Sequence, residues 1–180
     1  METKVIKNTN ILLIRHGEKP TEPTDIGLSV SGQERAMAYS IYLQNFQINS
    51  EIIKLDHLFA TAQSNHSNRS YLTIKPLAQQ LNLKINNNFT DSEEDIAALV
   101  NYLQTDPQFN STNILICWHH EKLLQIASAL GAPPHTLPGN WPDEVYGWLV
   151  QLSFDANGTL TTSITLEVKL MYDDYGHPVR

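Results

Sequence analysis

Basic and imidazole side chains follow two short apolar runs of the sequence, at the point where each run ends. Arg15 and His16 follow the run ILLI and precede Gly17, and His119 and His120 follow the run ILICW. Short apolar runs rich in branched residues are typical of buried strands in a parallel sheet. Because ligands of open α/β sheets bind at the carboxyl ends of strands, we expect these side chains to share one site.

A guanidinium next to an imidazole suits the transfer of a phosphoryl group. Arginine is always charged and presents a planar fork that matches phosphate oxygens. A neutral imidazole offers a lone pair near pH 7, and a second, protonated histidine would add a donor to the oxygens on which charge develops. We expect Gly17 to let the backbone turn, so that a phosphate can approach and accept a hydrogen bond from its N–H.

The elements that must position these residues alternate along the chain. Apolar runs predict strands over residues 10–15, 57–61, 83–85, 113–118, 145–154 and 161–170. Helical periodicity predicts helices over residues 31–46, 69–83, 92–104 and 121–131. This order predicts an α/β fold with a mainly parallel central sheet and helices on both faces.

Four local expectations accompany this reading. Ser31 and Glu34 have the spacing of a capping box and predict the start of the first helix. Pro76 is expected to divide the second helix into two pieces. The tail, residues 171–180, is expected to be a loosely held end. No linker or internal repeat interrupts the sequence, so residues 1–180 are predicted to form a single domain.

Composition narrows the classes of function. The 180 residues carry a formal net charge of -7, which argues against nucleic acid as a partner because backbone binding needs a broad basic surface. The single cysteine, Cys117, excludes an intrachain disulfide and a paired-cysteine metal site. No apolar stretch is long enough for a signal peptide or a membrane span, so no membrane is expected and a cytoplasmic location is predicted.

Four segments resemble, in the same order, motifs of the histidine phosphatase superfamily, also called the phosphoglycerate-mutase-like family. Arg15-His16-Gly17 resembles the RHG motif, and LSVSGQERA resembles the segment that opens its first helix. The phrase from FAT to RSYLTIKPLA resembles its second strand, second arginine and following threonine, and ILICWHHE resembles the strand before its second histidine. The resemblance covers roughly residues 10–131 and implies the three-layer sandwich of that family.

The resemblance also implies a role for each matched residue. His16 would be the nucleophile, and Arg15 and Arg69 would bind the phosphate, with no metal and no cofactor. His120 would be the second histidine of the pocket. His119 is the alternative, because consecutive side chains near a strand end point to opposite faces and only one can face the pocket.

The proton donor for the leaving group stays open. The mutase-type glutamate expected after the third strand has no counterpart in NNFTDSEED, whose acids we interpret as a solvated helix N-terminus. Glu121, which follows His120, is the first candidate, Glu18 is the second, and water is the third. Glu121 matches the place where an acid follows the second histidine in the acid-phosphatase branch of the family.

The sequence therefore predicts a metal-independent phosphohydrolase that acts on a small phosphorylated substrate through a phosphohistidine at His16. A mutase-type phosphotransferase is the nearest alternative, and a module that binds phosphorylated ligands without turnover is another. The intact set of Arg15, His16, Arg69 and His120 argues against simple binding, which needs no nucleophile. The sequence predicts neither the physiological substrate nor the oligomeric state.

Overall fold

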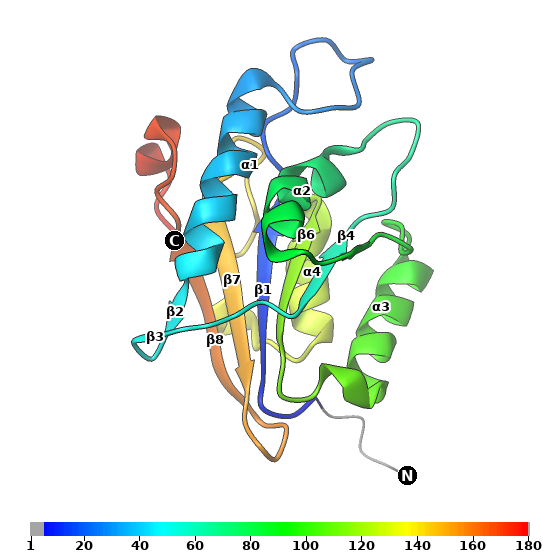
Figure 1. Cartoon of the computed structure of the whole chain (residues 1–180), viewed down its shortest axis with the longest axis vertical. Coiled ribbons are helices and arrows are strands. Elements are labelled where there is room, and N and C mark those ends of the chain that lie inside the picture. Colours follow the sequence, from blue (N-terminus) through cyan, green and yellow to red (C-terminus); the bar gives the residue numbers. More distant parts are fainter. Residues whose placement is uncertain (1–5, 180) are drawn as a thin grey trace.

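The computed structural model in Figure 1 describes residues 6–179 and contains a central sheet of six strands in the order β5-β4-β6-β1-β7-β8. The strands are β1 (Thr9–Arg15), β4 (His57–Ala60), β5 (Ile85–Asn86), β6 (Asn113–Trp118), β7 (Trp148–Phe154) and β8 (Leu160–Glu167). β5, β4, β6 and β1 are parallel, whereas β7 runs antiparallel to both β1 and β8. The predicted, mainly parallel sheet is confirmed.

Four helices cover the two faces of this sheet, as Figure 1 shows. They are α1 (Val30–Tyr42), α2 (Arg69–Leu81), α3 (Glu93–Thr105) and α4 (His120–Ala129). Alternation along β1 divides the core: Leu12 and Ile14 pack with α1 and α2, and Ile11 and Leu13 pack with α3 and α4. No helix within residues 6–179 is long and apolar enough to cross a membrane.

Some boundaries differ from the sequence prediction. α1 begins earlier than expected, because the side chain of Ser29, not that of Ser31, accepts the capping hydrogen bond from the Gly32 N–H. Pro76 lies inside α2 without dividing it. Short elements also appear that were not predicted: a two-stranded hairpin and four 3₁₀ turns, namely β2 (Gln47–Ile48), β3 (Glu51–Ile52), Leu43–Asn45, Pro107–Phe109, Pro134–Thr136 and Tyr172–Gly176.

The prediction of a loosely held tail is wrong for its described part. Asp174, in the 3₁₀ turn Tyr172–Gly176, is 7% exposed and accepts hydrogen bonds from both Nη atoms of Arg35, at 3.0 and 2.8 Å. The same guanidinium donates from Nε and Nη2 to Glu18 Oε1, at 2.9 and 2.7 Å. Arg35 therefore ties the C-terminal segment and the loop after β1 to α1, and these paired carboxylates raise its pKa.

Candidate active site

The strands that precede both histidine-containing segments end at the same edge of the sheet. In the parallel pairing of β1 with β6, Arg15 lies opposite Trp118. The backbone N–H of His16 donates to the Trp118 carbonyl at 3.1 Å. β4 ends one residue earlier on the other side of β6, where Ala60 lies opposite Cys117. Side chains that follow these strands are thus held by ladders of backbone hydrogen bonds.

His16 is 1% exposed, and its ring is held in one orientation by the backbone of the next residue. Its Nδ1 lies 2.7 Å from the carbonyl oxygen of Gly17, so Nδ1 carries the proton and Nε2 carries the lone pair. Burial lowers the pKa of His16 well below 6.5, and the charges of Arg15 and Arg69 lower it further. The imidazole is therefore neutral near pH 7, with a free lone pair on Nε2.

The imidazole ring of His119 packs edge-on against that of His16. The two ring centroids are 5.2 Å apart with an interplanar angle of 84°. His119 Nδ1 forms a hydrogen bond with the Asp91 carboxylate, and its Nε2 lies 3.3 Å from Ser67 Oγ. The sequence prediction preferred His120 for this place, and the structure corrects it by one residue.

The backbone explains this register. His119 follows the last residue of β6 in an extended conformation, with φ −77° and ψ 138°, so strand alternation continues through it. Its side chain therefore points to the same face as Cys117, which packs in the cluster with α1 and α2. Helix α4 begins at His120, whose Nε2 lies 3.7 Å from the Asp143 carboxylate instead.

Arg69 is the first residue of α2, and its side chain is held by the backbone of a neighbouring loop. Its Nη2 donates to the backbone carbonyl of Asp25 at 3.0 Å, and its side chain is half-buried. The Nε atom is buried and has no hydrogen-bond partner among residues 6–179. The backbone N–H of Arg69 donates to Ser67 Oγ at 3.3 Å, and the same oxygen lies 3.3 Å from His119 Nε2, so the start of α2 lies beside the ring that packs against His16.

The Arg15 side chain, which was predicted to bind phosphate, forms hydrogen bonds with the loop of residues 142–145. This side chain is fully buried, and Nη1 donates to the backbone carbonyls of Pro142, Asp143 and Val145, at 3.3, 2.6 and 2.8 Å. Nη2 donates to Asp143 Oδ1 at 3.0 Å, and the guanidinium carbon lies 3.8 Å from the centroid of the Tyr146 ring. In this structure the donors that we expected to bind phosphate are directed at the segment 142–145.

Gly17 has a structural role that differs from the one expected. Its N–H donates to Thr73 Oγ1 at 2.8 Å, so this donor is directed at α2 and not at a ligand. A Cβ atom on Gly17 would lie 2.8 Å from the carbonyl oxygen of Gly32. The glycine therefore allows the close approach of α1 to the end of β1, and Thr73 links α2 to the same turn.

The acidic residues lie in three different settings. Glu121 is exposed in the first turn of α4, and Glu18 is engaged by Arg35. Asp91, in the segment between β5 and α3, is the carboxylate that reaches His119, and its Oδ1 is buried without a partner within residues 6–179. The interpretation of this segment as a solvated helix N-terminus is wrong for Asp91, which no local pattern in the sequence distinguishes.

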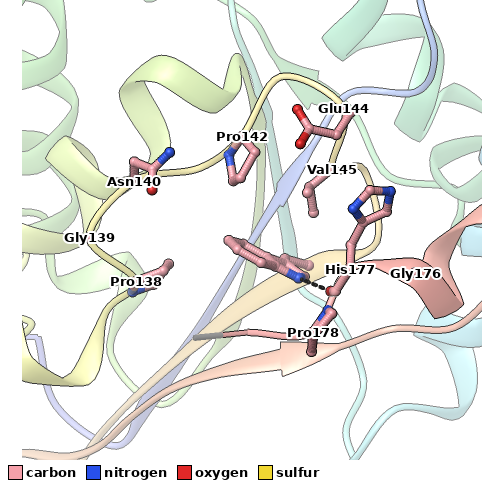
Figure 2. A pocket seen from close by; sticks show the side chains of 10 residues that line it. Pro138, Gly139, Asn140, Pro142, Glu144, Val145, Gly176, His177 and Pro178 are labelled. Carbon is pink, nitrogen blue, oxygen red and sulfur yellow. Dashed lines mark hydrogen bonds between the residues drawn. The ribbon is translucent and has the colours of Figure 1, made fainter.

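A cavity of about 370 Å³ is lined in part by the segment that Arg15 holds. It lies between residues 138–145 and the C-terminal segment, and Figure 2 shows Pro142, Val145 and His177 around it. None of the residues predicted for the site lines this cavity. This cavity therefore does not contain the His16 centre.

Comparison of sequences finds no match to a known family and no match to a curated protein. Comparison of structures finds a protein histidine phosphatase, SixA, complexed with tungstate, with a TM-score of 0.52 at 15% identity over 87% of this chain and 96% of that chain. A mycobacterial glucosyl-3-phosphoglycerate phosphatase with inorganic phosphate gives a TM-score of 0.53 at 14% identity, over 92% and 98%. A phosphoglycerate mutase from Bacillus anthracis str. Sterne gives 0.57 at 12% identity, over 96% and 97%.

At these identities the likeness establishes the fold. The chain has the phosphoglycerate-mutase-like α/β fold that these proteins share, with its central sheet and helices on both faces. The fold predicted from the resemblance to the histidine phosphatase superfamily is therefore confirmed. A shared fold does not fix an activity, which has to be argued from the site itself.

Proposed function

We propose that the protein is a phosphohydrolase that transfers a phosphoryl group from a small phosphomonoester to His16 and then to water. The observation that carries this proposal is the buried, neutral imidazole of His16, with Nδ1 bonded to the Gly17 carbonyl and Nε2 left as a nucleophile. The solved proteins with the same fold that act as phosphatases support the class of reaction.

The neighbours of His16 supply the other requirements of phosphoryl transfer. Arg69 and Arg15 provide permanent positive charge for the oxygens of the transferred group. His119 is bonded on one side to Asp91 and packs against the His16 ring, and in this proposal it exchanges a proton with the leaving group. A carboxylate that accepts the Nδ1 proton fixes the tautomer of a histidine and stabilises its protonated form.

The reaction has two steps. In the first, the His16 Nε2 lone pair forms a bond to phosphorus, the ester P–O bond breaks, and protonated His119 gives a proton to the leaving oxygen. In the second, neutral His119 takes a proton from water, whose oxygen bonds to phosphorus as the P–N bond breaks. Inorganic phosphate and the original neutral His16 result, and no redox step or additional reactant is needed.

The direct test is phosphate release from an aryl phosphate by the purified protein, with and without a chelator. We expect wild-type turnover that the chelator leaves unchanged, and loss of at least about 10³-fold in His16→Ala, as for removal of a nucleophile. His135→Ala is the matched control, because His135 is an exposed histidine at a 3₁₀ turn. Turnover that survives His16→Ala, or that appears only with added metal, would contradict the proposal.

A further inference from the structure

Three side-chain nitrogen atoms from separate parts of the chain lie around one oxygen of Asp143. Arg15 Nη2 lies 3.0 Å, Lys19 Nζ 3.2 Å and His120 Nε2 3.7 Å from Asp143 Oδ1. Arg15 ends β1, Lys19 lies in the loop after β1, and His120 begins α4. The carboxylate thus occupies a place that is built to hold an oxyanion.

The burial of these groups is strongly unequal. The Arg15 side chain is 0% exposed and that of His120 9%, whereas the Asp143 side chain is 72% exposed. In addition, Arg15 Nε is buried and has no hydrogen-bond partner within residues 6–179. The Lys19 side chain is 41% exposed. Two fixed, buried groups and one partly exposed ammonium group around an exposed carboxylate describe a preformed anion site with an occupant that solvent can reach. Ion pairs with so exposed a partner contribute little net stability, so another anion can replace it.

This place is adjacent to the His16 centre through the Tyr146 ring, whose centroid lies 3.8 Å from the Arg15 guanidinium carbon and 6.3 Å from the His16 ring centroid. Besides burial, the side chains that lower the pKa of His16 are those of His119, Arg15 and Arg69. Besides burial, those that lower the pKa of His120 are Arg15 and Lys19. Arg15 belongs to both sets, so its charge can act on an anion at either place. Only an anion beside His16 can be the phosphoryl group that is transferred.

We propose that Arg15, Lys19 and His120 form a second oxyanion subsite, that Asp143 fills it in the free protein, and that a second anionic group of the substrate takes its place. This inference rests on the proposed function in that the first group is the phosphate bound beside His16. It assigns the substrate class: phosphomonoesters that carry a carboxylate or another phosphate a short distance from the ester oxygen, in preference to esters of neutral alcohols.

Two ligands that differ in a single group test the subsite. Ethyl phosphate and phosphoglycolate share the phosphate ester and two-carbon frame, and only phosphoglycolate has a terminal carboxylate. Their dissociation constants are measured by calorimetry in the His16→Ala background, where neither is turned over. We expect phosphoglycolate to bind about three- to tenfold more tightly than ethyl phosphate, the range for one additional partly exposed charge contact.

Variants then assign this preference to the subsite. In Asp143→Asn the internal competitor is lost, so the preference for phosphoglycolate should rise by a further factor of about three to ten. In Lys19→Gln the preference should fall toward one. Glu144→Gln is the matched control, because Glu144 is an exposed carboxylate next to Asp143 and its replacement removes the same charge from the same loop. It should leave the preference unchanged.

The outcomes separate this inference from the proposed function. Equal binding of the two ligands, an equal gain for both in Asp143→Asn, or the same gain in Glu144→Gln would overturn the subsite. Failure of both ligands to bind would also overturn it. Absence of phosphate release by the wild-type protein would instead overturn the phosphohydrolase, whereas a selective gain in Asp143→Asn would still establish the subsite.

Discussion

The imidazole rings of His16 and His119 lie 5.2 Å apart, centroid to centroid, at an angle of 84°. One ring follows β1 and the other follows β6, and the two strands are neighbours in the sheet. Asp91 holds His119 on its far side through Nδ1. The ends of β1 and β6 therefore fix the positions of the His16 and His119 rings. Because it is His119 that packs against His16, we expect different roles for His119 and His120.

The first prediction concerns these adjacent histidines. His119→Ala should lower kcat/KM for an aryl phosphate by about 10²- to 10⁴-fold, the usual contribution of a positioned proton donor. His120→Ala should cost about tenfold or less on that substrate, because its ring reaches Asp143 and not His16. Initial rates and thermal melts of both variants check this. The reverse ranking would return the role to His120.

Asp91 should act through His119. Asp91→Asn keeps the size of the side chain but loses the carboxylate that is bonded to His119 Nδ1 and orients its ring, and kcat should fall about 10- to 100-fold. The loss should be larger for alkyl phosphates than for aryl phosphates, because poor leaving groups depend more on proton transfer. Rates for a series of esters of rising leaving-group pKa provide the measurement.

Two carboxylates serve as controls for Asp91. Glu94 is exposed in the first turn of α3, and Glu121 is exposed in the first turn of α4. Glu94→Gln and Glu121→Gln should each change the rates slightly and by the same factor for all esters. A loss in Glu121→Gln that is confined to poor leaving groups would make Glu121 the acid, as the sequence suggested.

The pKa of His16 predicts how stability depends on pH. Burial holds this pKa well below 6.5, so between the two values the unfolded chain binds a proton that the folded protein does not. The contribution of neutral His16 to the free energy of unfolding is therefore complete above pH 6.5. It is lost as the pH falls toward the pKa of His16 in the folded protein. One such proton makes the free energy of unfolding rise by about 1.4 kcal/mol for each step of one in pH. His16→Gln should remove this rise below about pH 6.5.

Urea unfolding at several pH values gives this slope. The pKa of His120 is also lowered, chiefly by burial, so part of the slope should persist in His16→Gln. His135→Gln, at an exposed position, should leave the slope as in wild type. A wild-type slope retained in full by His16→Gln would mean that His16 titrates normally in the folded protein.

Arg35 should be essential for stability, because it is the shared partner of two carboxylates. Arg35→Leu leaves the carboxylates of Glu18 and Asp174 without their partner in a buried setting, which should cost about 3 to 5 kcal/mol. Lys169→Leu breaks an exposed pair with Glu167, at 3.5 Å, and should cost less than about 1 kcal/mol. Denaturant unfolding compares the two variants, and equal costs would contradict the assignment.

Strong periodicity made most of the fold predictable. The apolar runs that became β1 and β6 and the stripe of Ile96, Leu99 and Val100 in α3 specify their elements locally, and all of these residues are buried. The hairpin of β2 and β3 has two residues in each strand, which is too short for a periodic signal. The buried pairing of the tail with Arg35 depends on residues 139 positions apart, and no local pattern encodes it.

The site was predictable where the chain itself places residues at strand ends, as with Arg15 and His16. The choice between His119 and His120 depended on whether His119 continues the extended backbone of β6 or belongs to helix α4. In the structure His119 is extended, so its side chain points toward His16. Asp91 was missed because its contact with His119 spans 28 residues and arises only when β5 and β6 lie in the same sheet.

The measurement that tests the central claim most directly is the location of phosphate on the protein during turnover. Wild-type protein is mixed with an aryl phosphate, quenched in alkaline denaturant to preserve phosphohistidine, digested and mapped by mass spectrometry. We predict one acid-labile phosphate on His16, present in wild type and absent in His16→Ala. Phosphate on another residue, or turnover with no phosphorylated peptide in either protein, would contradict the account.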